Sequence, residues 1–211
     1  MDQQQIDDQP IASTFFGEGR WLTEFVTPES LEIQTLHQMI IDSIGNPDSL
    51  EDRITALWSW VANEVKYTRF VKGKIWLSGQ TSVQDDYWAP PGITARIRVG
   101  NCATKSFLLG SLLRNELSAD RVHVVLGNLY NGKAGGHAWI QFDNYIMETT
   151  RPDVPPMVPV SSTERYEAVH LFNDQEVKSI EGKTVLVPFT ACYSTWLRDY
   201  LDWAYIEGAK R

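Results

Sequence analysis

The order of helical and strand-like patterns along the chain restricts its fold more than any other feature of the sequence. Apolar residues recur at three- and four-residue spacing in 31–44, 50–65 and 103–117, whereas strand-like segments follow residue 120, apart from a short one at 75–77. An alternating doubly wound fold would instead interleave helices with strands throughout. The sequence therefore predicts an α+β fold, with N-terminal helices packed on an antiparallel β-sheet.

Local start and stop signals divide the chain into elements. Thr27, Pro28 and Ser30 mark the start of the first helix, and Ser49, which two acidic residues follow closely, marks the start of the second. Period-two alternation indicates the strands, and clusters of glycine and proline indicate the loops between them. The sequence predicts strands at 75–77, 122–126, 137–142, 145–150, 169–172 and 185–187, loops at 85–92, 128–136 and 151–159, and a closing helix at 195–205.

The composition is that of an ordinary globular protein. Of 211 residues, 43% are hydrophobic and 22% are charged, and a chain of this size can bury roughly 70% of its unfolded surface. Residues 1–20 are polar, so we expect an N-terminal extension there. We expect residues 21–211 to form a single domain, with a core at about 50–150 and C-terminal strands and a helix at 165–206.

Charge and hydropathy exclude several classes of partner. The formal net charge is −8 and no dense stripe of Lys and Arg is present, so we expect no nucleic-acid partner. No apolar run is long enough to span a membrane, and the start of the chain lacks the pattern of a secretory signal. We therefore expect no membrane partner and a cytoplasmic location. The four histidines and two cysteines show no metal-ligand spacing, which predicts no metal and no cofactor.

Cys102 is the candidate nucleophile. It follows Gly100 and Asn101 at the start of the predicted 103–117 helix, where Asn101 is a candidate N-cap. The positive end of the helix dipole favours the thiolate, and backbone N–H groups at a helix start can hold an oxyanion. Cys192 has no polar constellation around it and is interpreted as a buried hydrophobe.

A predicted hairpin supplies the base that a cysteine nucleophile needs. Two strand-like segments flank the two-residue turn Asp143-Asn144, which suits a tight hairpin. Strand alternation then places His137 and Glu148 on one face as diagonal neighbours, with backbones roughly 7–8 Å apart. A carboxylate there can orient the imidazole and stabilise its cation. The opposite, more apolar face carries Ala138, Ile140, Phe142, Tyr145 and Met147.

Other interpretations of these residues stay open. His137 and Glu148 could simply be solvated on the outer face of the hairpin. His37, His123 and His170 are weaker candidate bases, because they lie on a predicted helix and strands without the pair of glycines that precedes His137. Asp153 is a fallback for the acid, although it follows Pro152 in a predicted loop.

A set of segments in a fixed order carries a family resemblance. In chain order they are Ile54 to Val61 with Val65-Lys66-Tyr67, Asp86-Tyr87-Trp88 with Pro90, Gly100-Asn101-Cys102-Ala103, Leu108 to Arg114, Gly136-His137-Ala138-Trp139, and Tyr145 to Thr150. Together they resemble the transglutaminase-like fold of the papain-like cysteine hydrolases. The resemblance covers about residues 50–150 and implies a helix carrying the cysteine, packed on an antiparallel sheet.

The resemblance also assigns roles. It implies that Cys102 is the nucleophile, His137 the base and Glu148 the orienting acid. The family more often has Asp at the positions of Glu148 and Asn101; the longer Glu changes the reach but keeps the charge. The candidates for oxyanion or substrate contacts are Trp88, Gln84 and Trp139, with Gln80 behind them.

The implied reaction is thiol-dependent acyl transfer on an amide bond of a peptide or protein, through a thioester on Cys102. Water as acceptor gives a peptidase or amidase, and an amine gives a transamidase; the sequence does not choose between them. The segment Gly132 to Gly136 beside His137 is either a plain surface loop or one that moves to admit substrate. A hypothesis from a different class is a catalytically silent transglutaminase-like module for binding or assembly.

Overall fold

The computed structural model describes residues 22–68, 73–77, 80–84, 88–131, 133–152, 155–162 and 165–183. Side chains are described in these ranges except at 73–77, 80–84, 131, 133 and 134. The predicted extension at 1–20, the strand at 185–187 and the closing helix at 195–205 lie outside the described residues, as does Cys192. No helix within the described ranges has the length and apolar character needed to span a membrane.

The N-terminal part of the described chain is helical. Its elements are the 3₁₀ turn η1 (Leu22–Phe25) and the helices α3 (Leu31–Ser43), α4 (Leu50–Glu64), α5 (Pro91–Ile97) and α6 (Cys102–Leu113). Ser30 and Ser49 are the N-caps of α3 and α4, and each hydroxyl accepts a hydrogen bond from a backbone N–H of the first turn. These caps pair donors that a helix start otherwise leaves unsatisfied.

A six-stranded sheet forms the C-terminal part. Its strands, in spatial order, are β10 (Val177–Ser179), β9 (Tyr166–Phe172), β5 (Val122–Asn131), β6 (Lys133–Phe142), β7 (Tyr145–Met147) and β8 (Val158–Pro159), all antiparallel, with the 3₁₀ turn η2 (Val160–Ser162) after β8. Two pairs precede it: β1 (Lys66–Tyr67) parallel to β4 (Val99–Gly100), and β2 (Gly73–Leu77) antiparallel to β3 (Gln80–Gln84). Helices followed by an antiparallel sheet constitute the predicted α+β fold.

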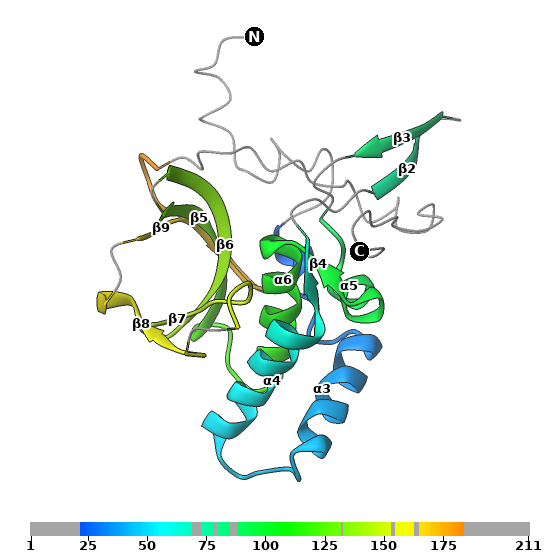
Figure 1. Cartoon of the computed structure of the whole chain (residues 1–211), viewed down its shortest axis with the longest axis vertical. Helices are drawn as coiled ribbons and strands as arrows, with labels where there is room; N and C mark the ends of the chain where they lie inside the picture. Colours follow the sequence, from blue (N-terminus) through cyan, green and yellow to red (C-terminus); the bar gives the residue numbers. More distant parts are fainter. Residues whose placement is uncertain are drawn as a thin grey trace.

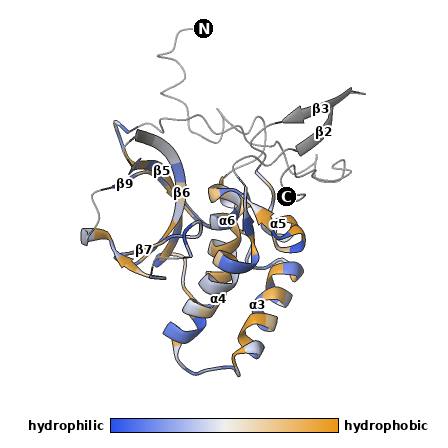
Figure 2. Ribbon diagram, viewed as in Figure 1, coloured by the Kyte–Doolittle hydropathy of each residue, from blue (hydrophilic) through white to orange (hydrophobic). Residues whose placement is uncertain are grey.

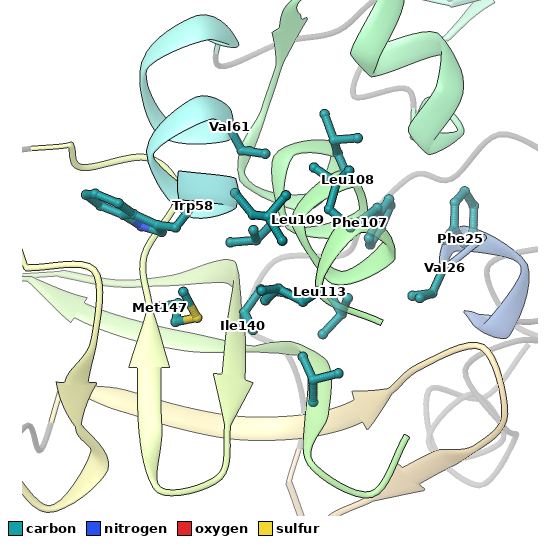
Figure 3. Close-up of a cluster of buried hydrophobic side chains, with 14 of the residues drawn as sticks. Phe25, Val26, Trp58, Val61, Phe107, Leu108, Leu109, Leu113, Ile140 and Met147 are labelled. Carbon is teal, nitrogen blue, oxygen red and sulfur yellow. The ribbon is translucent and has the colours of Figure 1, made fainter. Parts of the chain in front are cut away.

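Helix α6 is the centre of the molecule and lies between the sheet and the helices α3, α4 and α5 (Figure 1). Every residue from Ala103 to Leu113 is buried, whereas Cys102 at the helix start is half-buried. Hydrophobic residues run along α3, α5 and α6 (Figure 2). Figure 3 shows how α6 meets Trp58 and Val61 of α4 on one side and Ile140 and Met147 of the sheet on the other. A helix enclosed in this way is held rigidly, so the position of its first residue is fixed.

The hairpin of β6 and β7 has the predicted register and faces. Phe142 pairs with Tyr145 across the turn, where Asp143 adopts a φ of 50° that aspartate tolerates. Ala138, Ile140, Phe142 and Met147 join the main core under α6. Trp139 and Ile146 belong to a second buried cluster with Val125. The two-residue turn thus sets which side chains of the hairpin point away from the core.

Several predicted boundaries were wrong, and the largest error is the 128–136 loop. Its residues extend β5 and β6 into a longer hairpin, in which Asn128 pairs with Gly136 and Leu129 with Gly135. The segment Gly132 to Gly136 is therefore mostly β6, not a loop beside His137. Glycines disfavour strands only weakly, and pairing of β5 with both β6 and β9 outweighs that preference.

Smaller corrections concern strand ends and prolines. Strand β7 ends at Met147, so Glu148 follows the strand instead of lying within it. Pro91, predicted in a loop, begins α5, because a proline fits the first helical position. The sequence did not predict β1, β3, β4, β8 and β10. Of these, β1, β4 and β8 are only two residues long and β10 is three.

Candidate active site

A capping box fixes Cys102 as the first residue of α6. The Asn101 side chain accepts a hydrogen bond from the backbone N–H of Thr104 (3.0 Å), and the Thr104 hydroxyl accepts one from the Asn101 N–H (3.0 Å). These bonds confirm Asn101 as the N-cap. As the first helical residue, Cys102 has a backbone N–H without a partner inside the helix. The thiol and that N–H group therefore stand together at the positive end of α6.

Gly100 leaves room for this cap, which gives a prediction. A Cβ at residue 100 would lie 2.4 Å from the Thr104 hydroxyl, and Thr104 is fully buried. We expect Gly100→Ala to break the capping box and to lower the free energy of unfolding by about 1–2 kcal/mol. Urea unfolding measures the change. Gly135→Ala is the matched control, since nothing lies within 4 Å of its Cβ position; an equal loss in both variants would contradict the expectation.

His137 lies between Glu148 and Cys102. Its Nε2 is 2.7 Å from Oε2 of Glu148, and both side chains are buried, with His137 9% and Glu148 2% exposed. The Cys102 side chain also interacts with the imidazole, and this interaction raises the pKa of His137. Because Nε2 faces Glu148, Nδ1 is the nitrogen available to the sulfur. The structure thus brings together the three residues that the sequence singled out, and Glu148 is enclosed instead of solvated.

Four donors hold the carboxylate of Glu148. Oε1 accepts from the backbone N–H of Thr150 (2.8 Å) and from its hydroxyl (2.7 Å). Oε2 accepts from His137 and from the Tyr166 hydroxyl (3.0 Å). The backbone carbonyl of Glu148 accepts from the indole N–H of Trp58 (2.7 Å), which attaches this segment to α4. A buried carboxylate with this many donors stays ionised.

The pKa values of Glu148 and His137 shift in opposite directions from their ordinary values. Burial alone would raise the pKa of Glu148, but the hydrogen bond and charge of His137, with the two bonds from Thr150, lower it to about 2. Burial would likewise lower the pKa of His137, yet its hydrogen bonds and charge interactions with Cys102 and Glu148 raise it to about 10. At neutral pH the arrangement therefore holds an imidazolium between a carboxylate and the sulfur.

Lys105 is a buried cation one turn from Cys102. It is 1% exposed, and its Nζ donates to the backbone carbonyls of Val65 (2.7 Å) and Ala62 (3.1 Å) at the end of α4. Burial lowers the pKa of Lys105 to about 8, against a smaller opposing effect of the Glu148 charge. The ammonium therefore links the helix that carries Cys102 to α4, which also binds the Glu148 backbone through Trp58.

Aromatic rings cover the His137 side of the site. The rings of Trp139 and His137 are stacked with centroids 6.1 Å apart, and Tyr166 packs edge-on against Trp139 at 5.1 Å. Trp139, a predicted contact residue, is 1% exposed and therefore encloses this side of the site as a buried packing residue. Sequence reasoning did not find Tyr166 or Lys105. Tyr166 lies on a strand remote in sequence from the rest of the site. The one sequence signal for Lys105 was a lysine within an otherwise apolar helical segment.

The other predicted contact residues occupy different places. Trp88 is fully buried, with its ring edge-on to Phe25 and Phe107 at 5.5 and 5.1 Å, as a packing residue would be. Gln80 and Gln84 are the ends of β3, and their side chains are outside the described set. Asp153 also lies outside the described residues.

The remaining histidines have partners elsewhere. His37 lies 2.7 Å from Glu116, His123 lies 2.8 Å from Glu176, and His170 lies 2.9 Å from the Ser179 hydroxyl. Among the described side chains, no group of three or more His, Cys, Asp or Glu is placed to hold a metal ion. His137 is thus the histidine that the described structure joins to Cys102.

This fold is also present in a solved structure. LapG of Legionella pneumophila superposes with a TM-score of 0.52 at 17% identity, over 74% of this chain and 90% of that chain. Calcium-bound LapG gives 0.49 at 15% identity over 75% and 91%, and a candidate cysteine protease from Cytophaga hutchinsonii gives 0.41 at 20% over 90% and 64%. No family model and no curated protein matches the sequence. The likeness to LapG confirms the α+β fold.

Proposed function

We propose that this protein is a cysteine hydrolase or acyltransferase that acts on amide bonds of peptides or proteins. The observation that carries the proposal is the His137 ring, which lies 2.7 Å from the buried carboxylate of Glu148 and interacts with the Cys102 side chain at the start of α6. A base between a nucleophile and an orienting acid is the arrangement that acyl transfer needs. The fold shared with LapG is consistent with the family resemblance of the sequence.

The proposed reaction has two steps. The Cys102 thiolate attacks the amide carbonyl, and the C–N bond breaks as the His137 imidazolium gives its proton to the leaving nitrogen. The product is an amine and a thioester on Cys102. In the second step His137, now neutral, takes a proton from water or from an amine, whose oxygen or nitrogen attacks the thioester and releases the thiolate.

The start of α6 supplies the charge stabilisation for both steps. The backbone N–H of Cys102 has no partner inside the helix and stands beside the reacting sulfur, where a tetrahedral oxyanion forms. The helix dipole adds positive potential at the same point. We assign the oxyanion contact to this N–H group in preference to Trp88, whose ring is enclosed by the core.

Selective alkylation tests the nucleophile. A free cysteine has a pKa near 8.5, so little of it is thiolate at pH 6, whereas a thiolate–imidazolium pair is already ionised. We expect iodoacetamide at pH 6 to label Cys102 roughly ten times faster than Cys192. The label is lost in Cys102→Ala, is kept in Cys192→Ala, and forms much more slowly in His137→Ala. Mass spectrometry of the labelled peptides provides the rates.

Equal labelling of the two cysteines would contradict the proposal and favour a silent binding module. A library of fluorogenic peptide amides, screened with and without a primary amine, then identifies the acceptor. Acid products indicate hydrolysis, and amine-linked products indicate transamidation.

A further inference from the structure

Tyr166 contacts the proposed orienting acid from a different part of the chain. It lies on β9, beyond β5 in the sheet, and its hydroxyl donates to Oε2 of Glu148 over 3.0 Å. That oxygen is the one that faces His137. Two donors from separate strands therefore converge on one carboxylate oxygen.

We propose that Tyr166 is a positioning residue, which fixes Oε2 of Glu148 against the His137 ring and takes part of its negative charge. The inference rests on the proposed function and adds a fourth residue to its machinery. Tyr166 acts through Glu148 and does not touch the reacting sulfur in this assignment.

The length of Glu148 explains why a second clamp is needed. A glutamate has one more rotatable bond than an aspartate, so its carboxylate can swing further. Thr150 holds Oε1 through two bonds, but it follows Glu148 by only two residues and moves with the same segment. Tyr166 provides an anchor on the sheet itself, and its ring packs against Trp139 beside His137.

Sharing the oxygen also limits the charge that His137 receives. Each donor on a carboxylate oxygen reduces its power to stabilise another cation. The ionisable groups acting on the pair are Cys102 and Lys105 from α6 and Tyr166 from β9, with Arg151 and Arg165 acting on Tyr166. Without the Tyr166 hydroxyl, Oε2 of Glu148 would keep more negative charge and attract the His137 imidazolium more strongly. The carboxylate itself would be less fixed in position, so the orientation of the His137 ring would be less well defined.

The variant Tyr166→Phe separates the orientation of the His137 ring from the charge that the ring receives from Glu148. We expect peptide-amide cleavage to fall about three- to tenfold with KM unchanged, because proton delivery to the leaving nitrogen needs an aligned ring. Alkylation of Cys102 at pH 6, which needs only the thiolate, stays within about twofold. The NMR resonance of the His137 Nε2 proton at pH 7 moves downfield as its bond to Glu148 shortens.

Tyr130→Phe is the matched control, because the Tyr130 hydroxyl also donates to a glutamate of this sheet, Glu167, at 2.9 Å. It should change none of the three readouts. An unmoved Nε2 proton, or parallel losses of alkylation, cleavage and thermal stability in Tyr166→Phe, would overturn the positioning role. The NMR measurement needs no turnover, so it tests Tyr166 even if slow labelling of Cys102 refutes the proposed function.

Discussion

Glu148→Gln reduces amide-bond cleavage by about 10³- to 10⁴-fold, if Glu148 orients and charges His137 as proposed. Removing the charge from an orienting carboxylate has an effect of roughly this size in other acyl-transfer sites. The amide keeps the shape of the side chain but provides no anion for the imidazolium. It also places an NH₂ group where either the His137 or the Thr150 donors now point.

The pH dependence of alkylation gives the sign of this effect without a substrate. In the native protein the interactions of His137 with Cys102 and Glu148 outweigh the effect of its burial and raise the pKa of His137 to about 10. Losing the Glu148 charge lowers the pKa of His137, so the imidazolium deprotonates at a lower pH. We expect the iodoacetamide rate at pH 6–7 to fall, because a cationic imidazole beside a cysteine favours its reactive form.

Glu167→Gln is the control for this experiment. Glu167 is another carboxylate of the sheet, whose pKa is lowered to about 2 by hydrogen bonds from Lys183, Asn128 and Tyr130. It has no bond to His137, so its variant should keep the native alkylation profile. If both variants behaved alike, or if Glu148→Gln retained native cleavage, Glu148 would have no special role.

Local sequence signals were sufficient where the site depends on neighbours along the chain. The Asp143-Asn144 turn predicted the register that carries His137 toward Glu148, and Asn101 was identified as the cap of α6. Both features follow from residues within a dozen positions. The strand prediction was inaccurate at Glu148, which lies just beyond β7.

Long-range contacts were beyond the reach of such signals. Tyr166 is 18 residues from Glu148, and Lys105 is 43 residues from Ala62. Nothing in the local pattern specifies that β9 follows β5 in the sheet or that α4 ends beside α6. The extension of β5 and β6 through a glycine-rich segment was missed for a similar reason, since pairing with β9 helps hold those residues in a strand.

Lys105→Met should destabilise the protein, and the loss should grow at alkaline pH. At pH 7 the substitution removes the unfavourable free energy of burying an ammonium but leaves the carbonyls of Ala62 and Val65 without their donor. Since unsatisfied buried acceptors cost about 1–3 kcal/mol each, we expect a net loss of about 2 kcal/mol in the free energy of unfolding. The nucleophile helix also loses its link to α4, so Cys102 should alkylate more slowly.

The pH signature of that variant follows from the direction of the pKa shift. Burial lowers the pKa of Lys105 to about 8 from 10.5, so between these values the unfolded chain binds more protons than the folded one. Native stability therefore gains from Lys105 as the pH rises through this window, by on the order of 3 kcal/mol. Lys105→Met lacks the gain, and its deficit against the native protein widens from pH 7 to pH 10.5 in urea titrations. Lys178→Met, at an exposed lysine paired with Glu176, should show no such widening; a constant deficit for Lys105→Met would mean that its ammonium is not buried as the structure places it.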